Sequence, residues 1–423
     1  MTDNESANSP SLRGRASRPA NIRSQNERLV LDVLRSKGKA TRAELADATS
    51  LTLPAISSIT QGLVDEGIVI EHRDPRADGG RGRPPVIVEF LANSRYVVAI
   101  SLNRVHTQIM VADALGNEIA RRTIEDFDDA NPQAVIATLR RLIVLLMSDA
   151  NINADQISAV GVTIGGAVDG STGHVASAPR LGWTDVPLRD LLADDFAGLL
   201  GNVPIHVIDS GRAVAVAEAT EGKAHSLRNV IVVDVGATIS AAIIQNGRIT
   251  NGANGLAGHL GACQIPVINL DHKWGDPEPP RRTIDYYAST QGMYDRYMEK
   301  RPDQIDTSKS VRLVLDAVSD QDQDAINVLV ESGVYLALGI SWLVNLLDPD
   351  HIVLTGALGT LDEVYQNAII ALIQDRLSPD QADRLEVRFS DRGIDGWLRG
   401  AVMAALQDNS ISLAHLFDRA LIA

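Results

Sequence analysis

The chain has almost no cysteine and lacks the features of an exported protein. Cys263 is the only cysteine among 423 residues, so an intrachain disulfide and a cysteine-rich zinc site are excluded. The first twenty residues are polar and rich in serine and arginine, which predicts that there is no secretory signal peptide. Both absences favour a reducing compartment, and we expect a cytoplasmic location.

Long uncharged apolar runs are also scarce. The segment 328–347 is long enough to resemble a membrane span, but it contains Glu331, Ser332, Ser341 and Asn345. These polar residues predict a buried core helix rather than a membrane helix, so we expect no membrane association.

The charge is acidic overall and unevenly distributed. The formal net charge of −15 argues against a general nucleic-acid coat. Residues 1–95 carry 14 Lys and Arg against 12 Asp and Glu, whereas the remaining residues carry 25 against 42. A slightly basic head on an acidic body, in a chain long enough for two or three domains, is compatible with one DNA-binding module joined to a larger partner domain.

The head has the pattern of a winged helix-turn-helix over residues 22–92, behind an arm at 1–21 whose composition predicts disorder. Thr41 and Glu44 form a capping box that starts a second helix, and a third helix runs from Pro54 to about Glu66. Two apolar-rich strands then flank a basic loop of glycine and proline. Helix, helix, turn, helix and hairpin are the plan of this DNA-binding domain.

The third helix is expected to enter the major groove, and the loop is expected to reach the minor groove or the phosphates. Taking 100° per residue, the outward face and its flanks provide small polar groups for base edges. The candidate DNA-binding residues are Thr52, Pro54, Ala55, Ser57, Ser58 and Gln61 on the helix, and Arg81, Gly82 and Arg83 on the wing. The alternative is a three-helix protein-interaction module with the same apolar pattern.

Residues 93–423 alternate apolar strands with helical stretches, which indicates an α/β body. A strand, a small-residue turn, a second strand and a glycine turn occur twice. Ser101 and Asp234 are 133 residues apart at matching positions, and Gly116 and Gly247 are 131 residues apart. This repeat predicts a duplicated unit with a cleft between the two halves.

Four segments of the body resemble the ROK family (repressors, open reading frames and kinases): GVTIGGAVDGSTGHV, APRLGWTDVPL, GANGLAGHLGA and DPDHIVLTGALG. The resemblance covers about residues 22–405. It implies a two-lobed actin/hexokinase-like fold whose members are sugar kinases or sugar-responsive repressors, and the winged helix favours the regulators.

The kinase motifs that the resemblance implies are altered here. The first phosphate turn, usually Asp-x-Gly-Gly-Thr, reads Ser-Leu-Asn-Arg-Val at 101–105, and the second, usually Gly-Thr-Gly-x-Gly, reads Gly-Ala-Thr-Ile-Ser at 236–240. Counting eight residues back from Glu218 places Ser210 at the family's catalytic base, although a register shift of one would make Asp209 the base. Phosphoryl transfer needs positioned phosphates and an oriented hydroxyl, so we expect no catalytic residue and no enzyme activity.

The zinc and sugar motifs of the family are altered too. The zinc-binding histidine is Ala262, and the expected cysteine cluster near 270–283 contains no cysteine, so neither a metal nor a cofactor is predicted. The sugar-binding glutamate is His259, the asparagine before Leu-Gly-Trp is Arg180, and the glutamate before Ser289 is Asp285.

These exchanges add positive charge to a site that the family builds for neutral hydroxyls. The resemblance implies effector binding by Arg180, Asp209, Ser210, His259 and Asp285, and the charge change favours a small anion or zwitterion. The alternative is that Arg180 and His259 pair with Asp285 or Asp209 and close a pocket that binds nothing.

The sequence therefore predicts a ROK-type transcriptional regulator that binds a double-stranded DNA operator and a small-molecule effector. A homodimer or homotetramer is expected, because regulators of this kind read two half-sites. A ROK-fold sugar kinase and an effector-independent DNA-binding protein remain the alternatives.

Overall fold

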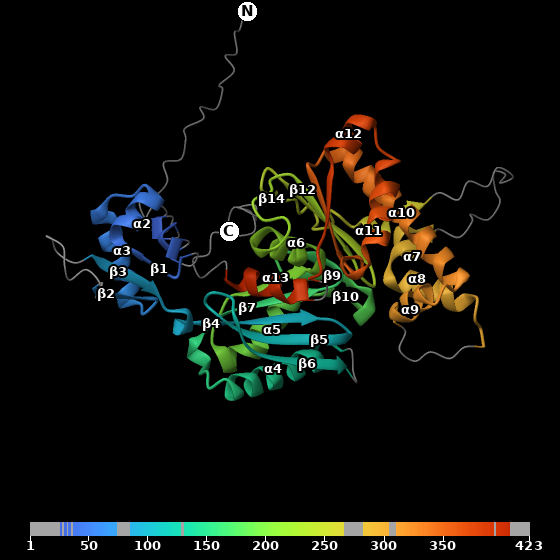
Figure 1. Ribbon diagram of the computed structural model, residues 1–423. Coiled ribbons are helices and arrows are strands. Elements are labelled where there is room, and N and C mark those ends of the chain that lie inside the picture. The colour runs from blue at the N-terminus through green and yellow to red at the C-terminus, as the bar shows by residue number, and fades with distance from the viewer. Residues whose placement is uncertain are drawn as a thin grey trace, which may run out of the picture. The chain divides into compact units, whose positions relative to one another are not determined.

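The computed structural model divides into two compact units between Leu91 and Ala92 (Figure 1). It describes residues 26–27, 29–31, 33–34, 37–73, 85–127, 131–265, 282–303, 310–392 and 395–406. The predicted N-terminal arm at 1–21 lies outside these residues.

The first unit is a winged helix-turn-helix, as predicted. The described residues between 26 and 34 are helical, and the other elements are β1 (Lys39–Thr41), α2 (Arg42–Thr49), α3 (Leu53–Asp65), β2 (Val69–Arg73) and β3 (Val86–Phe90). The strands form an antiparallel sheet in the order β1-β3-β2. The capping box of Thr41 and Glu44 is present at the start of α2. Thr52 caps α3, so Pro54 is its second residue rather than its first.

The second unit begins with a lobe built on a five-stranded sheet in the order β11-β7-β4-β5-β6. We call this lobe 1. Its elements are η1 (Ala92–Ser94), β4 (Tyr96–Leu102), β5 (Val105–Asp113), β6 (Glu118–Asp126), α4 (Pro132–Asp149), η2 (Ala154–Gln156), β7 (Ile157–Ile164), β8 (Ala167–Asp169), β9 (His174–Ala178), η3 (Pro179–Leu181), β10 (Trp183–Val186), α5 (Leu188–Leu200) and β11 (Ile205–Asp209). The helices α4 and α5 pack on one face of the sheet through a shared apolar core.

The second lobe, lobe 2, repeats this sheet in the order β14-β13-β12-β17-β18. In both sheets a strand pairs antiparallel with its successor and parallel with a later strand. The elements of lobe 2 are β12 (Val230–Val235), β13 (Ile239–Gln245), β14 (Arg248–Ile249), η4 (Leu260–Ala262), β15 (Gln264–Ile265), β16 (Arg282–Thr283), α7 (Ile284–Ala288), α8 (Thr290–Glu299), α9 (Arg312–Ser319), α10 (Gln323–Leu347), β17 (His351–Gly356), η5 (Ala357–Thr360), α11 (Glu363–Gln374), α12 (Pro379–Arg384) and β18 (Glu386–Phe389). The matching topology confirms the predicted duplication.

Two glycine turns sit at equivalent places in the repeat. Asn246 and Gly247, with φ of 53° and 77°, join β13 to β14, and Gly116, with φ of 84°, lies in the turn between β5 and β6. Positive φ at both central residues suits the tight hairpin that the Asn-Gly pair predicts.

The remaining two helices exchange lobes. The helix α6 (Ser210–Glu221) follows β11 of lobe 1 but packs on β12 and β13 of lobe 2. The helix α13 (Asp395–Leu406) follows β18 of lobe 2 but packs on β4 and β7 of lobe 1. Figure 1 shows α13, in red, lying along the sheet that contains β4 and β7. The two helices also pack against each other, so they form the layer between the lobes.

Glycines allow this layer to pack closely. A Cβ atom at Gly161 of β7 would lie 1.9 Å from the Ala401 carbonyl oxygen, and one at Gly400 of α13 would lie 2.2 Å from the Ala213 carbonyl oxygen. Contacts this short between a side chain and backbone are forbidden, so both positions require glycine.

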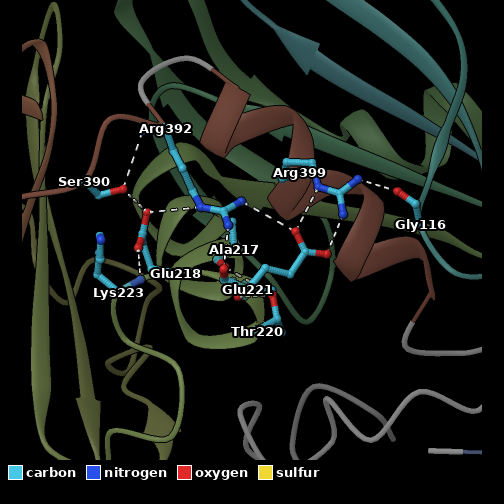
Figure 2. Close-up of polar contacts among 10 residues, drawn as sticks. Gly116, Ala217, Glu218, Thr220, Glu221, Lys223, Ser390, Arg392 and Arg399 are labelled. Atoms are coloured by element: carbon cyan, nitrogen blue, oxygen red, sulfur yellow. Dashed lines mark hydrogen bonds and ion pairs between the residues drawn. The ribbon is translucent and has the colours of Figure 1, made fainter. Parts of the chain in front are cut away.

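A charged network closes the outer end of the same layer (Figure 2). Glu221 of α6 accepts hydrogen bonds from Arg399 of α13, at 3.2 Å from Nε, and from Arg392. Arg399 also donates to the carbonyl of Gly116 in lobe 1. Buried Glu218 accepts from the hydroxyl of Ser390 at 2.5 Å, so the network joins α6, α13 and the turn between β5 and β6.

A break at Ser289 divides the helical segment 284–299 into α7 and α8. Ser289 interrupts it, because its hydroxyl caps α8 by accepting from the Gly292 amide at 3.0 Å. The sequence also did not predict the small sheet β10-β9-β8 of lobe 1 or the C-terminal helices α11 to α13.

Gly400→Ala is expected to destabilise the body by about 1–3 kcal/mol, because the new methyl group overpacks the contact with Ala213. Gly198→Ala in α5 is the matched control: its Cβ meets nothing within 4 Å, so higher helix propensity should stabilise it by up to about 1 kcal/mol. Thermal unfolding followed by circular dichroism measures both. Equal behaviour of the two variants would contradict the close packing of α6 and α13.

Candidate functional site

The outward face of α3 carries the candidate base-reading residues. Thr52, Pro54, Ser58 and Gln61 are exposed, whereas Ala55 and Ser57 are half-buried. The Nε2 atom of Gln61 donates to Asp65 at 2.9 Å, which leaves the amide oxygen of Gln61 as an acceptor. The predicted wing residues Arg81, Gly82 and Arg83 lie outside the described residues.

Ser57 is held by an arginine that the sequence analysis missed. Arg42, the first residue of α2, donates to the Ser57 hydroxyl at 3.3 Å and to both carboxylate oxygens of Glu71 at 2.6 Å. This cluster joins α2, α3 and β2. Arg42 therefore positions the reading helix against the first strand of the wing, and the Ser57 hydroxyl is less available to DNA than that of Ser58.

The candidate effector residues lie at the boundary between lobe 1 and lobe 2. We call this boundary the seam. On lobe 1, Asp209 ends β11 and caps α6, and Ser210 is the buried first residue of α6. On lobe 2, half-buried His259 precedes η4, and a Cβ atom at Gly261 of η4 would lie 2.1 Å from the Asp285 carboxylate. Arg180, the fifth, lies in η3 of lobe 1, so the five residues do not form one continuous cluster.

The first group contains Asp209 and a second missed residue, Arg212. Asp209 accepts from the backbone amide of Arg212 at 3.0 Å and from its Nε atom. The side chains of both residues are nearly buried, with relative exposures of 12% and 5%. Asp209 thus has Arg212 as its partner, rather than Arg180 or His259 as the alternative prediction proposed.

The second group contains Arg180 and Asp285. Asp285 accepts from the Ile239 amide at 2.6 Å; burial raises its pKa, while this amide and the Arg180 charge lower it. Arg180 donates to the neutral amide oxygen of Gln291 at 3.2 Å. Its side chain is exposed, yet surrounding protein lowers its pKa, and the charges of Asp285 and Asp295 raise it. A cation and a carboxylate therefore face the same seam.

Both turns that correspond to phosphate turns are filled by side chains of this chain. In the first, Thr107 bonds both the amide and the carbonyl of Asn103, which closes the turn between β4 and β5. In the second, the Ile239 amide is engaged by Asp285. A backbone amide that already binds a carboxylate is unavailable to a phosphate unless that carboxylate moves.

Buried polar residues lie on the faces of the two sheets that point towards the α6–α13 layer. Strand alternation directs Ser101 and Thr163 of lobe 1, and Asp234 and Thr355 of lobe 2, away from the apolar cores and towards the α6–α13 layer. The carboxylate of Asp234 accepts from the indole Nε1 of Trp397 at 2.8 Å. The pKa of Asp234 is raised to about 6, because burial raises it more than this hydrogen bond lowers it.

Within the described parts of the chain, no cluster of three or more His, Cys, Asp or Glu side chains could hold a metal ion. Most of the region near 270–283, where the family has a cysteine cluster and this chain has no cysteine, lies outside those parts. An apolar cavity of about 560 Å³ lies between α10 and α11, and none of the five predicted effector residues lines it.

The long apolar stretch predicted to be a core helix is α10. Of the described helices, this one is long and apolar enough to cross a membrane. Its residues Val328, Leu336, Ile340 and Val344 pack in the core of lobe 2, as the sequence predicted.

A winged helix-turn-helix joined to a body of two duplicated lobes defines a DNA-binding head on an actin/hexokinase-like fold. Residues 97–408 match the ROK family and residues 23–70 match the winged helix-turn-helix DNA-binding domains. The chain belongs to the ROK family, and its head groups it with the DNA-binding transcriptional regulators of that family.

Curated relatives include regulators and a kinase. A putative xylose repressor of Caldicellulosiruptor sp. (strain Rt8B.4) is 22% identical over 396 residues, which cover 92% of this chain and 96% of that protein. The DNA-binding transcriptional dual regulator NagC of Escherichia coli (strain K12) is 22% identical over 353 residues, which cover 83% of this chain and 85% of that protein. A glucokinase of Halalkalibacterium halodurans is 26% identical over 278 residues, which cover 63% of this chain and 81% of that protein.

Solved structures show the same fold. The crystal structure of a ROK family transcriptional regulator, a homologue of the E. coli MLC protein, superposes with a TM-score of 0.75 at 21% identity, covering 95% of this chain and all of that one. A ROK glucokinase from Streptomyces griseus superposes with a TM-score of 0.60 at 18% identity, covering 74% and 99%.

The raised pKa of Asp234 predicts a pH-dependent stability. The folded state holds this proton more tightly than the unfolded state, whose pKa is near 3.8, so the stabilisation is complete below that value and lost as pH rises through about 6. Asp234→Asn removes the charge and keeps an acceptor for Trp397. We expect it to be more stable than wild type at pH 7.5, by up to about 3 kcal/mol, and the gain to shrink towards pH 4.5.

Thermal unfolding at several pH values tests this. Asp194→Asn, which removes an exposed carboxylate from α5, controls for net charge. A gain for Asp234→Asn that does not change with pH would contradict the buried ionised carboxylate.

Proposed function

We propose that this ROK protein is a transcriptional regulator whose winged helix binds a double-stranded DNA operator and whose body senses a small molecule in the seam between its lobes. The observation that carries the proposal is the exposed polar face of α3 on a winged helix joined to a ROK body. A reducing, cytoplasmic location and a dimer or tetramer that reads two half-sites are part of the proposal.

We propose further that the body has no kinase activity. The helix α6 is continuous from Ser210 to Glu221, which supports the count that puts Ser210 rather than Asp209 at the position of the family's base. Asp209 is bound to Arg212, and the turns at Asn103 and Ile239 are occupied by Thr107 and Asp285. The similarity to a glucokinase reflects the shared fold of the body.

The effector is a small anion or zwitterion. Arg180 binds a neutral amide, and a guanidinium forms stronger, bidentate bonds with a carboxylate or phosphate. Asp285, whose pKa the charge of Arg180 lowers, suits an ammonium or hydroxyl group of the same ligand. Some relatives are named for xylose, a neutral sugar, and the positive charge of Arg180 supports a different ligand class here.

Hydrogen bonds connect the α6–α13 layer to the residue at which the second unit begins. Arg399 of α13 bonds the carbonyl of Gly116, and the amide of Ala114 in the same turn donates to the carbonyl of Ala92 at 3.0 Å. Ala92 is the first residue of the second unit. A ligand that changes the angle between the lobes would move this turn and so bias the paired winged helices.

Gln61→Ala should cost about 1–3 kcal/mol of operator binding at one base-pair position, if the amide of Gln61 reads a base. Ser57→Ala should cost less binding free energy, because Arg42 already holds the hydroxyl of Ser57. Fluorescence anisotropy at fixed salt, with the region upstream of the protein's own gene and a set of single base-pair variants, measures both. Uniform weakening on all sequences would make Gln61 a phosphate contact instead.

The same assay with a metabolite panel of sugars, sugar phosphates, amino acids and acyl-amino acids tests the effector. We expect an anionic or zwitterionic compound to change operator affinity and to raise the melting temperature, and Arg180→Gln to weaken its binding by at least about tenfold. Gln291→Ala removes the neutral partner and serves as the control. Stabilisation by neutral hexoses, with no response to acidic compounds, would refute the charge assignment.

A further inference from the structure

Arg212 is a buried arginine whose guanidinium binds both lobes at once. It is the third residue of α6 and has a relative exposure of 4%. Within lobe 1 its Nε atom bonds Asp209, and its Nη2 atom donates to the Val168 carbonyl at 2.6 Å. Towards lobe 2 its Nη1 atom donates to the Asn251 side chain at 3.0 Å, and Nη2 donates to the Gly255 carbonyl at 3.2 Å.

The backbone contact that Arg212 covers requires both a cation and a glycine. The carbonyl oxygens of Val168 and Gly255 come from different lobes and converge on one nitrogen atom, and without a shared donor these two dipoles would repel each other. Gly255 has φ of 68°, and a Cβ atom there would lie 2.3 Å from the Val168 oxygen. The seam is therefore closed to van der Waals contact at this point.

We propose that Arg212 is the positioning residue of the effector site and holds the seam between the lobes closed. It ties β8 of lobe 1 to the loop 250–258, which leads directly into His259 of lobe 2. It also pairs with Asp209, so this carboxylate is less available to accept hydrogen bonds from the hydroxyl groups of a polyol. We call this closure of the seam by Arg212 the latch. The latch is inferred from the contacts of Arg212, and only its consequence for regulation rests on the proposed function.

The planar fork of the guanidinium is essential to this role. Three nitrogen atoms point to one carboxylate, one side-chain amide and two carbonyls at fixed angles, which an ammonium group cannot reproduce. Lysine at position 212 retains the charge opposite Asp209 but loses the bridge. Comparing Arg212→Lys with Arg212→Gln therefore separates charge from geometry.

Hydrogen exchange on the full chain, without DNA or ligand, tests the latch. Arg212→Gln and Arg212→Lys should both accelerate exchange in β8 and in residues 250–258 together, on the order of tenfold. Small-angle scattering should show a larger radius of gyration. Arg189→Gln is the matched control, since the carbonyls of Ser171 and Gly170 that accept from Arg189 both belong to lobe 1. Faster exchange confined to the start of α6 would reduce Arg212 to a helix cap and overturn the proposal.

A second pair of variants tests the same seam without altering Arg212. Gly255→Ala places a methyl group against Val168 across the seam, whereas Gly252→Ala, with a similar φ of 72°, faces Ala257 within its own loop. We expect Gly255→Ala to accelerate exchange in β8 and Gly252→Ala to leave it unchanged. Equal effects on β8 would contradict a closed seam, and this test applies even if the Arg212 variants do not fold.

Operator affinity then separates the latch from the proposed function. If the Arg212 variants open the seam and change operator affinity by at least about fivefold, closure is coupled to DNA binding. An open seam with unchanged operator affinity would support the latch and refute regulation through lobe closure. Loss of operator binding with an unchanged seam would overturn the latch and leave the DNA-binding assignment in place.

Discussion

The exchange of α6 and α13 between the lobes is the constraint on which the body depends. Each helix belongs covalently to one lobe and covers the sheet of the other, so the lobes cannot separate without unpacking both sheets. Close backbone contacts at Gly161 and Gly400 leave no room for sliding, and the network around Glu221 closes the outer end. Such a layer permits a change of angle about the two helices more readily than a translation.

This constraint forms the seam at which we propose that a small molecule binds. The carboxyl ends of the parallel strands in both sheets meet at the seam, as is general for ligand sites in α/β proteins. In this chain three of the polar groups there are bound by other residues of the body: Asp209 by Arg212, Asp234 by Trp397 and the Ile239 amide by Asp285. A site whose donors are already engaged is suited to switching partners when a ligand binds, and poorly suited to holding a nucleotide.

In the winged helix, too, charged residues are used for contacts within the protein. The reading helix carries no Lys or Arg, and Arg42 is used to join Ser57 to Glu71 rather than to meet phosphate. Attraction to DNA in general is therefore weak in the described part of the head, and the acidic body adds none. In the proposed function, hydrogen bonds from α3 to base edges provide the sequence specificity.

The sequence by itself determined the local and periodic features of this protein. The capping box at Thr41, the Asn246–Gly247 turn, the buried strands and the duplicated order of strands were all predictable, because each depends on neighbouring residues or on a repeated pattern. The resemblance also located the residues around the seam. Only the tertiary structure decided their partners: Arg212 meets groups 39 to 44 residues away, and Asp285 meets the amide of Ile239 46 residues away. Such pairs form because two exchanged helices bring separate lobes into contact, and no local pattern records that closure.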